Sequence, residues 1–321
     1  MFKYIIYRLL MLIPIILGIS FLIFFVMSLS PGDPARIILG EYATQEDVDA
    51  LREEMGLNDA LIVQYGRYIF KAIKGNLGTS YQTKQPVMKE IMEHFPYTLK
   101  LATGAVLIAV ILGIPIGVIS AVKQYSWIDN LSMVISMVLT SMPGFWYGLM
   151  LMIIFALNLR WFPSTGASSF KHYVLPCITL SCNTFALMIR TTRSTMLEEI
   201  RQDYVRTARA KGAKAMRVIT RHSLRNALLP VITVAGMQFG ILLGGAVVIE
   251  NVFSIPGLGT YVVNAVKLKD TPCVTAAIMF IAVTGGIVNL IVDVLYTYID
   301  PRLKSRYVKA KTIRDEEKEV A

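Results

Sequence analysis

LLMLIPIILGISFLIFFVMS, the stretch from Leu9 to Ser28, contains twenty residues without a formal charge. An α-helix of about 20 mostly apolar residues is long enough to cross the hydrocarbon core of a membrane. The stretch is longer than the apolar core of a signal peptide, and no evident cleavage site follows it. It therefore predicts a retained transmembrane helix.

Five further uncharged stretches follow along the chain, at Leu101–Val122, Leu131–Leu159, Tyr173–Ile189, Asn226–Ile249 and Thr271–Val292. Hydrophobic residues make up 55% of the 321 residues and charged residues only 17%, whereas a soluble domain has about 25% charged residues. The sequence therefore predicts an all-α, polytopic membrane protein with six transmembrane helices.

Two of these stretches have distinctive features. The third is long and contains Pro143-Gly144, which predicts a kink or a break in the helix. The fourth is the shortest and most polar, with Ser181, Asn183 and Thr184, so we expect it to face other helices or a cavity.

The charges between the stretches predict the orientation. Arg190–Arg225 carries ten Lys/Arg and three Asp/Glu, a net charge of +7, and the tail from Arg302 carries a net +3. Pro31–Pro96 carries seven Lys/Arg and ten Asp/Glu, a net −3. Because positive loops stay on the cytoplasmic side, we expect both termini and Arg190–Arg225 on the cytoplasmic side of the membrane. The net charge of +10 thus reflects membrane topology, and no nucleic-acid partner is expected.

The external segment is expected to be a small lid of short helices. Thr44 is a plausible N-cap, followed by acidic residues in the first helical turn. Val48, Leu51 and Met55 share one helical face, and Gly56 can end the helix.

The predicted organisation has four parts. Residues 1–30 form the cytoplasmic N-terminus and the first span, and residues 31–96 form the external helical segment. Residues 97–300 form the transmembrane core with spans two to six, including the cytoplasmic loop 190–225. Residues 301–321 form a cytoplasmic tail.

Motifs for chemistry are missing from the sequence. Cys177, Cys182 and Cys273 form no CxxC pair, and no HExxH or GxxxxGK[ST] motif occurs. We interpret Gly257-Leu-Gly259 as part of a turn rather than as a phosphate loop. The chain is therefore not expected to be an enzyme, and it is not expected to bind a metal or ATP.

The most informative stretch is DYVRTARAKGA, Asp203–Ala213. Met196, Ile200, Tyr204 and Ala208 form a stripe at i, i+4 spacing, and Gly212 lies four residues after Ala208, so this helix face is nearly bare of side chains. Gly212 also permits a turn. A second amphipathic segment, Met216–Leu224, leads into the fifth span.

This pattern predicts a short helix-turn-helix on the cytoplasmic face that can dock in a groove of another protein. A simpler interpretation is that the arginines only enforce topology or bind anionic lipid. The small-residue face and the turn glycine do not follow from that interpretation.

The stretch resembles the cytoplasmic EAA loop of ABC importer permeases, in the branch for dipeptides, oligopeptides and nickel. Thr207-Ala208 and Gly212 match the Ala-Ala and Gly positions of the general motif. The sequence departs from that motif at Arg206, where Glu is expected, at His222, where Ile is expected, and at Pro230, to which the proline is displaced. The string DYVRTARAKG…RHSLRNALLPV is similar to the loop sequence of this branch. The departures from the general motif therefore indicate this subfamily.

The resemblance extends over essentially the whole chain. Segments similar to those of the branch occur at Pro31–Pro34, Gly75–Tyr81, Gly244–Gly259 and Asp300–Arg302. Each segment alone is a weak signal, but their order and spacing together are specific.

The resemblance implies a type I ABC importer permease fold with an external helical insert after the first span. A second homologous permease subunit would complete the transport pathway, two ATPase subunits would bind the loops, and an extracytoplasmic binding protein would deliver substrate. ATP and Mg²⁺ would bind to the partner subunits. The residues that the resemblance assigns to coupling with the ATPase are Tyr204, Arg206, Thr207, Ala208, Ala210, Lys211 and Gly212.

The substrate is less well defined by the resemblance. We expect di- or oligopeptides, with nickel or metal chelates and glutathione as alternatives. From a different class, an ion-coupled secondary transporter would need charged or broken helices at mid-membrane. Only Asp293 comes near this requirement, and its simpler interpretation is a polar contact at a helix end.

Overall fold

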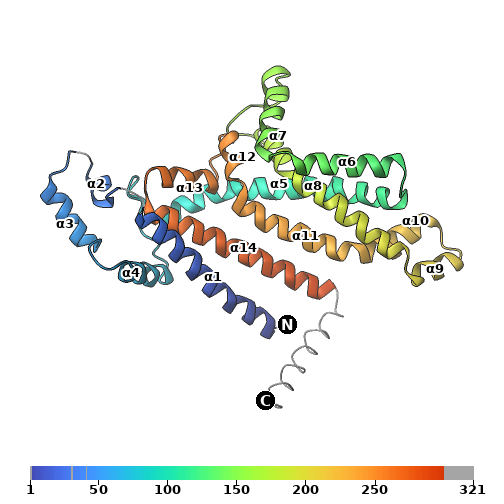
Figure 1. The fold of residues 1–321 in the computed structure, drawn as a ribbon, viewed down its shortest axis with the longest axis horizontal. Helices are drawn as coiled ribbons and strands as arrows, with labels where there is room; N and C mark the ends of the chain where they lie inside the picture. The colour runs from blue at the N-terminus through green and yellow to red at the C-terminus, as the bar shows by residue number, and fades with distance from the viewer. Residues whose placement is uncertain (1, 30–31, 41, 300–321) are drawn as a thin grey trace, which may run out of the picture.

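The computed structural model describes residues 2–29, 32–40 and 42–299, and it is helical almost throughout this range (Figure 1). No β-strand forms within the described residues, which confirms the all-α class. The tail 301–321, the Asp300–Arg302 motif and Pro31 lie outside them. The helices are α1 (Phe2–Leu29), α2 (Pro34–Leu39), α3 (Gln45–Met55), α4 (Leu61–Ile73), α5 (Val87–Val122), α6 (Trp127–Ser141), α7 (Gly144–Leu151), α8 (Lys171–Ile200), α9 (Asp203–Ala210), α10 (Ala215–Arg217), α11 (Leu224–Gly245), α12 (Val247–Val252), α13 (Leu258–Lys267) and α14 (Thr271–Ile299), with the π-helical segments η1 (Met152–Asn158) and η2 (Val218–Ser223).

Five helical segments in the described part of the chain are long and apolar enough to cross a membrane singly. The remaining predicted span is present as two helices, Trp127–Ser141 and Gly144–Asn158, which meet at an angle of 101°. The break at Pro143 confirms the predicted kink or break, because proline lacks the N–H that a continuous helix would use. In Figure 1, α7 turns upward at the end of α6, and it packs against α8 and α12. The five single segments are Ile5–Leu29, Val87–Val122, Lys171–Ile200, Ala215–Gly244 and Thr271–Val294.

At the centre of the bundle, α5 packs lengthwise against α8. Their backbones approach closely because α5 presents glycines to α8. A Cβ on Gly117 would lie 2.6 Å from the Cβ of Thr192 and 2.9 Å from the backbone oxygen of Ile189. Small residues allow this approach between helices in a membrane, where packing rather than the hydrophobic effect drives association.

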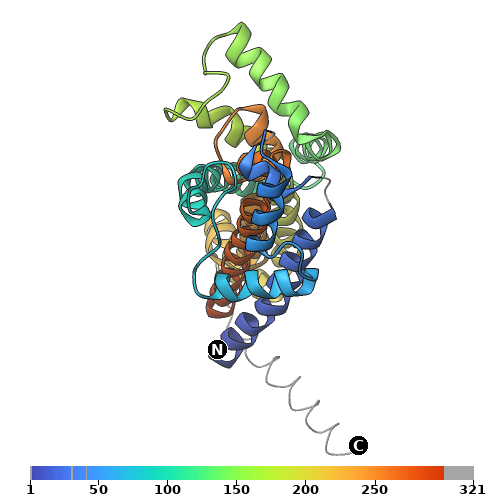
Figure 2. The same ribbon diagram turned by 90° about the vertical axis from the view of Figure 1, so that its left-hand side faces the viewer.

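The other long helices extend this central pair. Helix α11 packs against both α8 and α14, and α1 packs against α14 at the margin of the bundle (Figure 2). An ion pair of 3.0 Å joins Arg8 of α1 to Asp293 of α14. Asp293 therefore makes the polar contact predicted for it and is not a free carboxylate available for ion coupling.

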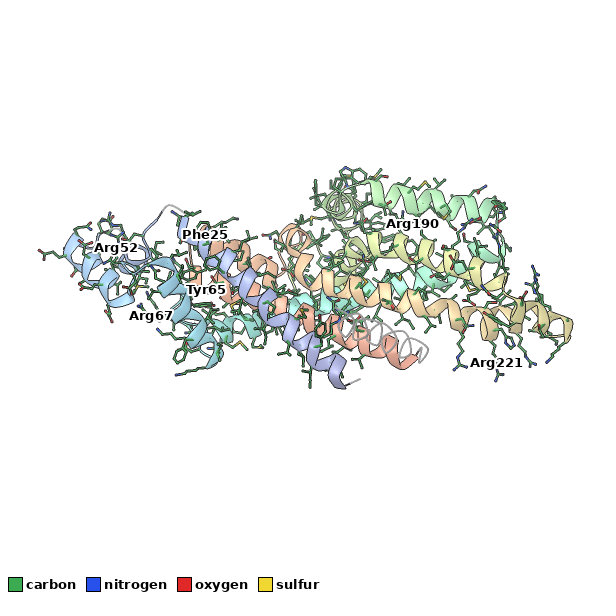
Figure 3. All side chains as sticks on the ribbon, turned by 60° about the horizontal axis from the view of Figure 1, so that its bottom comes forward. Phe25, Arg52, Tyr65, Arg67, Arg190 and Arg221 are labelled. Carbon is green, nitrogen blue, oxygen red and sulfur yellow. The ribbon has the colours of Figure 1, made fainter. Side chains whose placement is uncertain are left out.

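The segment after α1 forms the predicted lid of short helices, α2, α3 and α4. The Thr44 hydroxyl accepts a hydrogen bond from the Asp47 N–H at 3.3 Å, and Gly56 ends α3 with a left-handed backbone. Both predicted caps are thus confirmed. Figure 3 shows Arg52 and Arg67 of the lid at one end of the molecule and Arg221 at the other. The lid and the segment 190–225 therefore lie at opposite ends, as the predicted orientation requires.

One predicted boundary differs from the structure. The charge-free stretch begins at Leu101, but α5 begins at Val87. The carboxylate of Glu90 is 9% exposed and accepts hydrogen bonds from Thr83 (2.5 Å) and Tyr261 (2.7 Å). Because these bonds satisfy the buried charge, the helix continues through a segment that hydropathy alone excludes.

The close approach of α5 and α8 can be tested with one methyl group. Gly117→Ala should destabilise the protein by about 1–3 kcal/mol, because the added Cβ would overlap Thr192 and push the helices apart. Gly18→Ala in α1 is the matched control, since no heavy atom lies within 4 Å of its added Cβ. The measurement is the thermal unfolding midpoint of each detergent-solubilised variant. Equal midpoints for the two variants would contradict this account of the packing.

Candidate functional site: the helical hairpin at residues 190–225

The loop between α8 and α11 folds as a compact helical hairpin. Helix α8 ends at Ile200, α9 spans Asp203–Ala210, and α10 with η2 leads into α11. This confirms the predicted helix-turn-helix. It also corrects one expectation, since Met196 and Tyr204 do not share one continuous helix. The backbone of Gln202 is extended, and Asp203 starts a new helix with an acidic first turn.

Gly212 lies in the turn that ends α9. Its φ is +79°, its N–H donates to the Arg209 carbonyl (2.9 Å), and the Ala213 N–H donates to the Ala208 carbonyl (3.2 Å). This is the Schellman pattern, in which a glycine in the left-handed region closes the helix. Gly212 is therefore outside α9 and does not form a bare helix face with Ala208, contrary to the prediction. No heavy atom of the chain lies within 4 Å of its added Cβ, so the glycine faces open space.

The hairpin is anchored by one apolar residue of α9 and presents the rest of that helix outward. Val205 is fully buried and Ala208 is half-buried. The other residues of the predicted contact face are all exposed: Tyr204, Arg206, Thr207, Ala210, Lys211 and Gly212. The structure thus brings most of the predicted coupling residues onto one accessible turn of chain.

Tyr204, one of the predicted coupling residues, also has its hydroxyl bonded within the chain. It donates to the Glu199 carboxylate at the end of α8 and accepts from Asn226 Nδ2 of α11 at 3.0 Å. Burial and the adjacent Glu199 carboxylate raise the pKa of the Tyr204 phenol, so it stays protonated and can donate. Tyr204 therefore connects α9 to α8 and to α11. These two contacts were not predicted from the sequence.

A buried ion pair fixes α8 just before the hairpin. Arg193 donates from Nε to Asp129 Oδ1 (2.6 Å) and from Nη2 to Asp129 Oδ2 (2.8 Å). Asp129 is 1% exposed and also accepts hydrogen bonds from the Ser120 hydroxyl and the Tyr125 N–H. This bidentate geometry is the strong form of an arginine–carboxylate contact. The sequence analysis missed the pair, because Asp129 lies just outside an uncharged stretch and sixty-four positions from Arg193.

The surface of the hairpin is strongly basic. Behind α9 a hollow of about 200 Å³ is lined by Arg201 and Arg209 together with apolar residues of α5, α8 and η2. Neither arginine has an acidic partner in the described part of the chain. This arrangement can bind an acidic surface, but it carries no nucleophile or acid–base pair. The exposed cations are Arg201, Arg206, Arg209, Lys211, Lys214, Arg217, Arg221 and Arg225.

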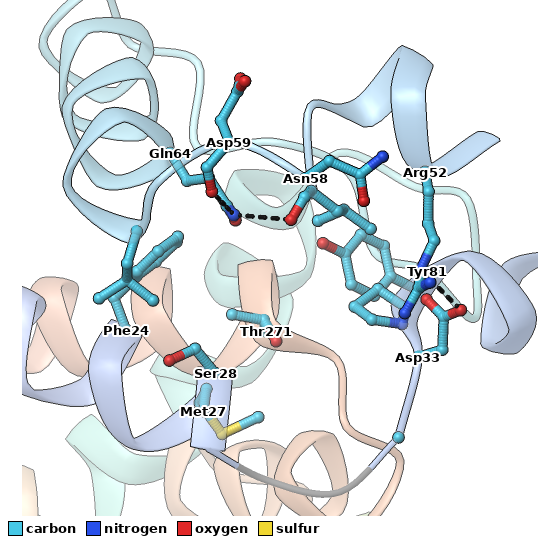
Figure 4. A pocket seen from close by; sticks show the side chains of 14 residues that line it. Phe24, Met27, Ser28, Asp33, Arg52, Asn58, Asp59, Gln64, Tyr81 and Thr271 are labelled. Carbon is cyan, nitrogen blue, oxygen red and sulfur yellow. Dashed lines mark hydrogen bonds and ion pairs between the residues drawn. The ribbon is translucent and has the colours of Figure 1, made fainter. Parts of the chain in front are cut away.

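A second hollow, of about 440 Å³, lies between α1, the lid and the start of α14 (Figure 4). Arg52 and Asp33 on its wall are ion-paired at 3.1 Å, and Gln64 donates to the carbonyls of Leu57 and Asp59. Because these groups already bond to one another, they are not free to bind a ligand in the hollow. The basic hairpin is therefore the stronger candidate site.

Comparisons with known proteins agree with this geometry. Residues 113–305 match the model of the binding-protein-dependent transport system inner membrane component, and residues 1–102 match its N-terminal membrane component. The dipeptide permease DppB of Alkalihalophilus pseudofirmus is 42% identical over 95% of this chain and 100% of its own. The glutathione permease GsiC of Escherichia coli K12 is 41% identical over 95% of this chain and 99% of its own.

A chain of the MetNI methionine ABC transporter is similar in fold, with a TM-score of 0.58, 16% identity, and coverage of 67% of this chain and 99% of that chain. The likeness supports the type I permease fold and no more than the fold. With both family models matched and relatives aligned over nearly its whole length, this chain belongs to the family of inner-membrane components of binding-protein-dependent transport systems.

Proposed function

We propose that the chain is the channel-forming permease subunit of an ATP-driven importer of di- or oligopeptides. The observation that carries the proposal is its 42% identity to a dipeptide permease over the full length of that relative. Glutathione is the second candidate substrate, because glutathione permeases are 41% identical over 99% of their length. Nickel or metal chelates are a third candidate.

The proposed assembly contains this chain, a second homologous permease subunit, two ATPase subunits and an extracytoplasmic binding protein. It lies in the plasma membrane of a bacterium, in contact with lipid, with both termini and the hairpin cytoplasmic. ATP and Mg²⁺ bind to the ATPase subunits, and the ATPase subunits carry out hydrolysis. The positive charge of residues 190–225 and the lid at the opposite end of the bundle support this orientation.

The hairpin is the proposed contact with the ATPase. Its exposed turn, from Arg206 to Gly212, is rigid because Val205 is buried beneath it and the Schellman bonds close it. Tyr204 links α9 to Glu199 of α8, and Arg193 links α8 to Asp129 in the first turn of α6. A force on α9 therefore reaches three membrane helices through bonded contacts.

Reconstitution tests the proposed function. The chain with its permease, ATPase and binding-protein partners should take up labelled dipeptide into vesicles when ATP is supplied, and omission of the ATPase should abolish uptake. The purified chain alone should hydrolyse no ATP. Uptake that persists without the ATPase, driven by an ion gradient, would favour a secondary transporter and overturn the proposal.

Two substitutions in the hairpin test its coupling role. Gly212→Val places a β-branched residue at a φ of +79°, where a side chain costs roughly 1–2 kcal/mol. We expect it to distort the turn and to lower ATP-driven uptake and ATPase copurification sharply, at normal membrane abundance. Gly212→Asn is the matched control, because asparagine tolerates this conformation, and it should retain most uptake.

Ala208→Trp provides an independent change, since it adds bulk beside the buried Val205 without altering the turn. It should also weaken ATPase association. Normal uptake by both Gly212→Val and Ala208→Trp would rule out the hairpin as the coupling element, while leaving the family assignment intact.

A further inference from the structure

One face of α8 carries polar side chains from within the predicted span Tyr173–Ile189 into the segment 190–225 that follows it. Asn183, Arg190, Ser194 and Glu198 are separated by seven, four and four positions. At 100° per residue these positions fall within about 80° of one another on the helix. The four positions extend over about 22 Å, at 1.5 Å per residue. The polar face therefore extends along the helix and is not confined to one end.

None of these four side chains has a hydrogen-bond or ion-pair partner within the described residues. Asn183, Ser194 and Glu198 are exposed, and Arg190 is half-buried with its Nε buried and unpartnered. Arg193, less than one turn further on, is fully engaged with Asp129. The lack of partners is therefore a property of this face and not of α8 as a whole.

The face lies on an open side of the bundle. The helices beside it are α6, reached through Arg193 and Asp129, and α11, reached through Thr184 and Gln238 at 3.5 Å. Helix α7 packs against the earlier part of α8, where Gly148 lies beside Thr179. Helix α5 covers the opposite side of α8, where Gly117 meets Thr192. In Figure 3, Arg190 lies between the lid at one end and Arg221 at the other, within the length of the bundle.

Lipid is a poor neighbour for such a face. An arginine or asparagine in a spanning helix is costly unless it meets water, a polar partner or the headgroup region. A long cation at the end of a span, such as Arg190, can reach the headgroups, but Asn183 is short and lies twelve residues after the start of α8. The face therefore borders water or a polar surface outside this chain.

We propose that the Asn183–Glu198 face of α8 lines the aqueous path of the transported peptide and that Arg190 binds the carboxylate of that peptide. This inference rests on the proposed function. A planar guanidinium pairs with a carboxylate through two parallel hydrogen bonds. Dipeptides and glutathione share a free carboxylate, so a single arginine suits either candidate substrate. Binding is reversible and involves no covalent step.

The first test measures water access in the assembled transporter. The native cysteines are replaced, and single cysteines are placed at Asn183, Leu187 and Ser194, which share the face. A charged, membrane-impermeant methanethiosulfonate should modify all three, and excess dipeptide or glutathione should slow the reaction at position 187. Two control positions should stay unmodified: Met188, which is buried, and Ile111 of α5, which is 64% exposed on another surface of the bundle.

The second test measures charge at position 190 directly. Arg190→Cys should lower ATP-driven uptake about tenfold or more, the loss expected for one charge-assisted contact in the path. Modification with aminoethyl methanethiosulfonate, which adds a cation, should restore much of the uptake. The neutral methyl reagent and the anionic sulfonatoethyl reagent should restore none. Lys171→Cys, an exposed cation on the same helix outside the face, should transport normally with or without reagent.

The outcomes separate this inference from the proposed function. If the cysteine-free parent takes up neither dipeptide nor glutathione with ATP, the proposed function fails. If the parent transports but the face stays unmodified, the face is covered by lipid or by the second permease and the inference is wrong. Equal rescue by the neutral reagent would show that Arg190 acts through bulk, and this result would also overturn the carboxylate assignment.

Discussion

The ion pair between Asp129 and Arg193 is the contact on which the hairpin end of the bundle depends. Asp129 is almost completely buried and accepts from Arg193, Ser120 and the Tyr125 N–H, so its charge is satisfied from three segments of chain. Removing one partner of such a pair leaves an uncompensated buried charge, at a cost of about 3–5 kcal/mol. The pair joins α5, α6 and α8 immediately before the hairpin.

Helix contacts extend from this ion pair in two directions along α8. Toward the membrane, Gly117 lets α5 lie directly against α8, so the two helices form a stiff central pair. Toward the hairpin, α8 ends at Ile200 and is bonded to α9 through Glu199 and Tyr204. The polar face that we assign to the peptide path lies on α8. The exposed turn that we assign to ATPase contact is bonded to α8 through Tyr204 and Glu199. A movement of α9 can change that path without a separate linkage.

The sequence was sufficient for features set by local patterns. Hydropathy located the spans, Pro143 predicted the break, and Thr44 and Gly56 predicted the ends of α3. It was insufficient where long-range contacts decide the structure. The start of α5 at Val87 depends on Glu90 meeting Thr83 and Tyr261, and Tyr261 is 171 positions away. Asp129 likewise meets Arg193 at a separation of 64 positions, and Tyr204 meets Asn226 at a separation of 22, so no local pattern indicates these two contacts.

The hairpin illustrates both outcomes. The turn glycine was identified from its position, but Gly212 proved to be the residue that closes α9 and not part of a helix face. Tyr204 was assigned to a partner protein because it lies in the matching motif, while the structure uses its hydroxyl to hold α9 in place. Tyr204 is nevertheless exposed, as are Arg206, Thr207, Ala210 and Lys211, so its bonds within the chain do not exclude the predicted contact with a partner.

Photocrosslinking tests the central claim, that this turn is the ATPase contact, most directly. A benzophenone amino acid is incorporated at Arg206 in the assembled transporter, and at Tyr42, which is fully exposed on the lid, as the control. Irradiation should join position 206 to the ATPase subunit and leave position 42 without any ATPase product. The absence of an ATPase product from position 206 in a transporter that still takes up peptide would contradict the account.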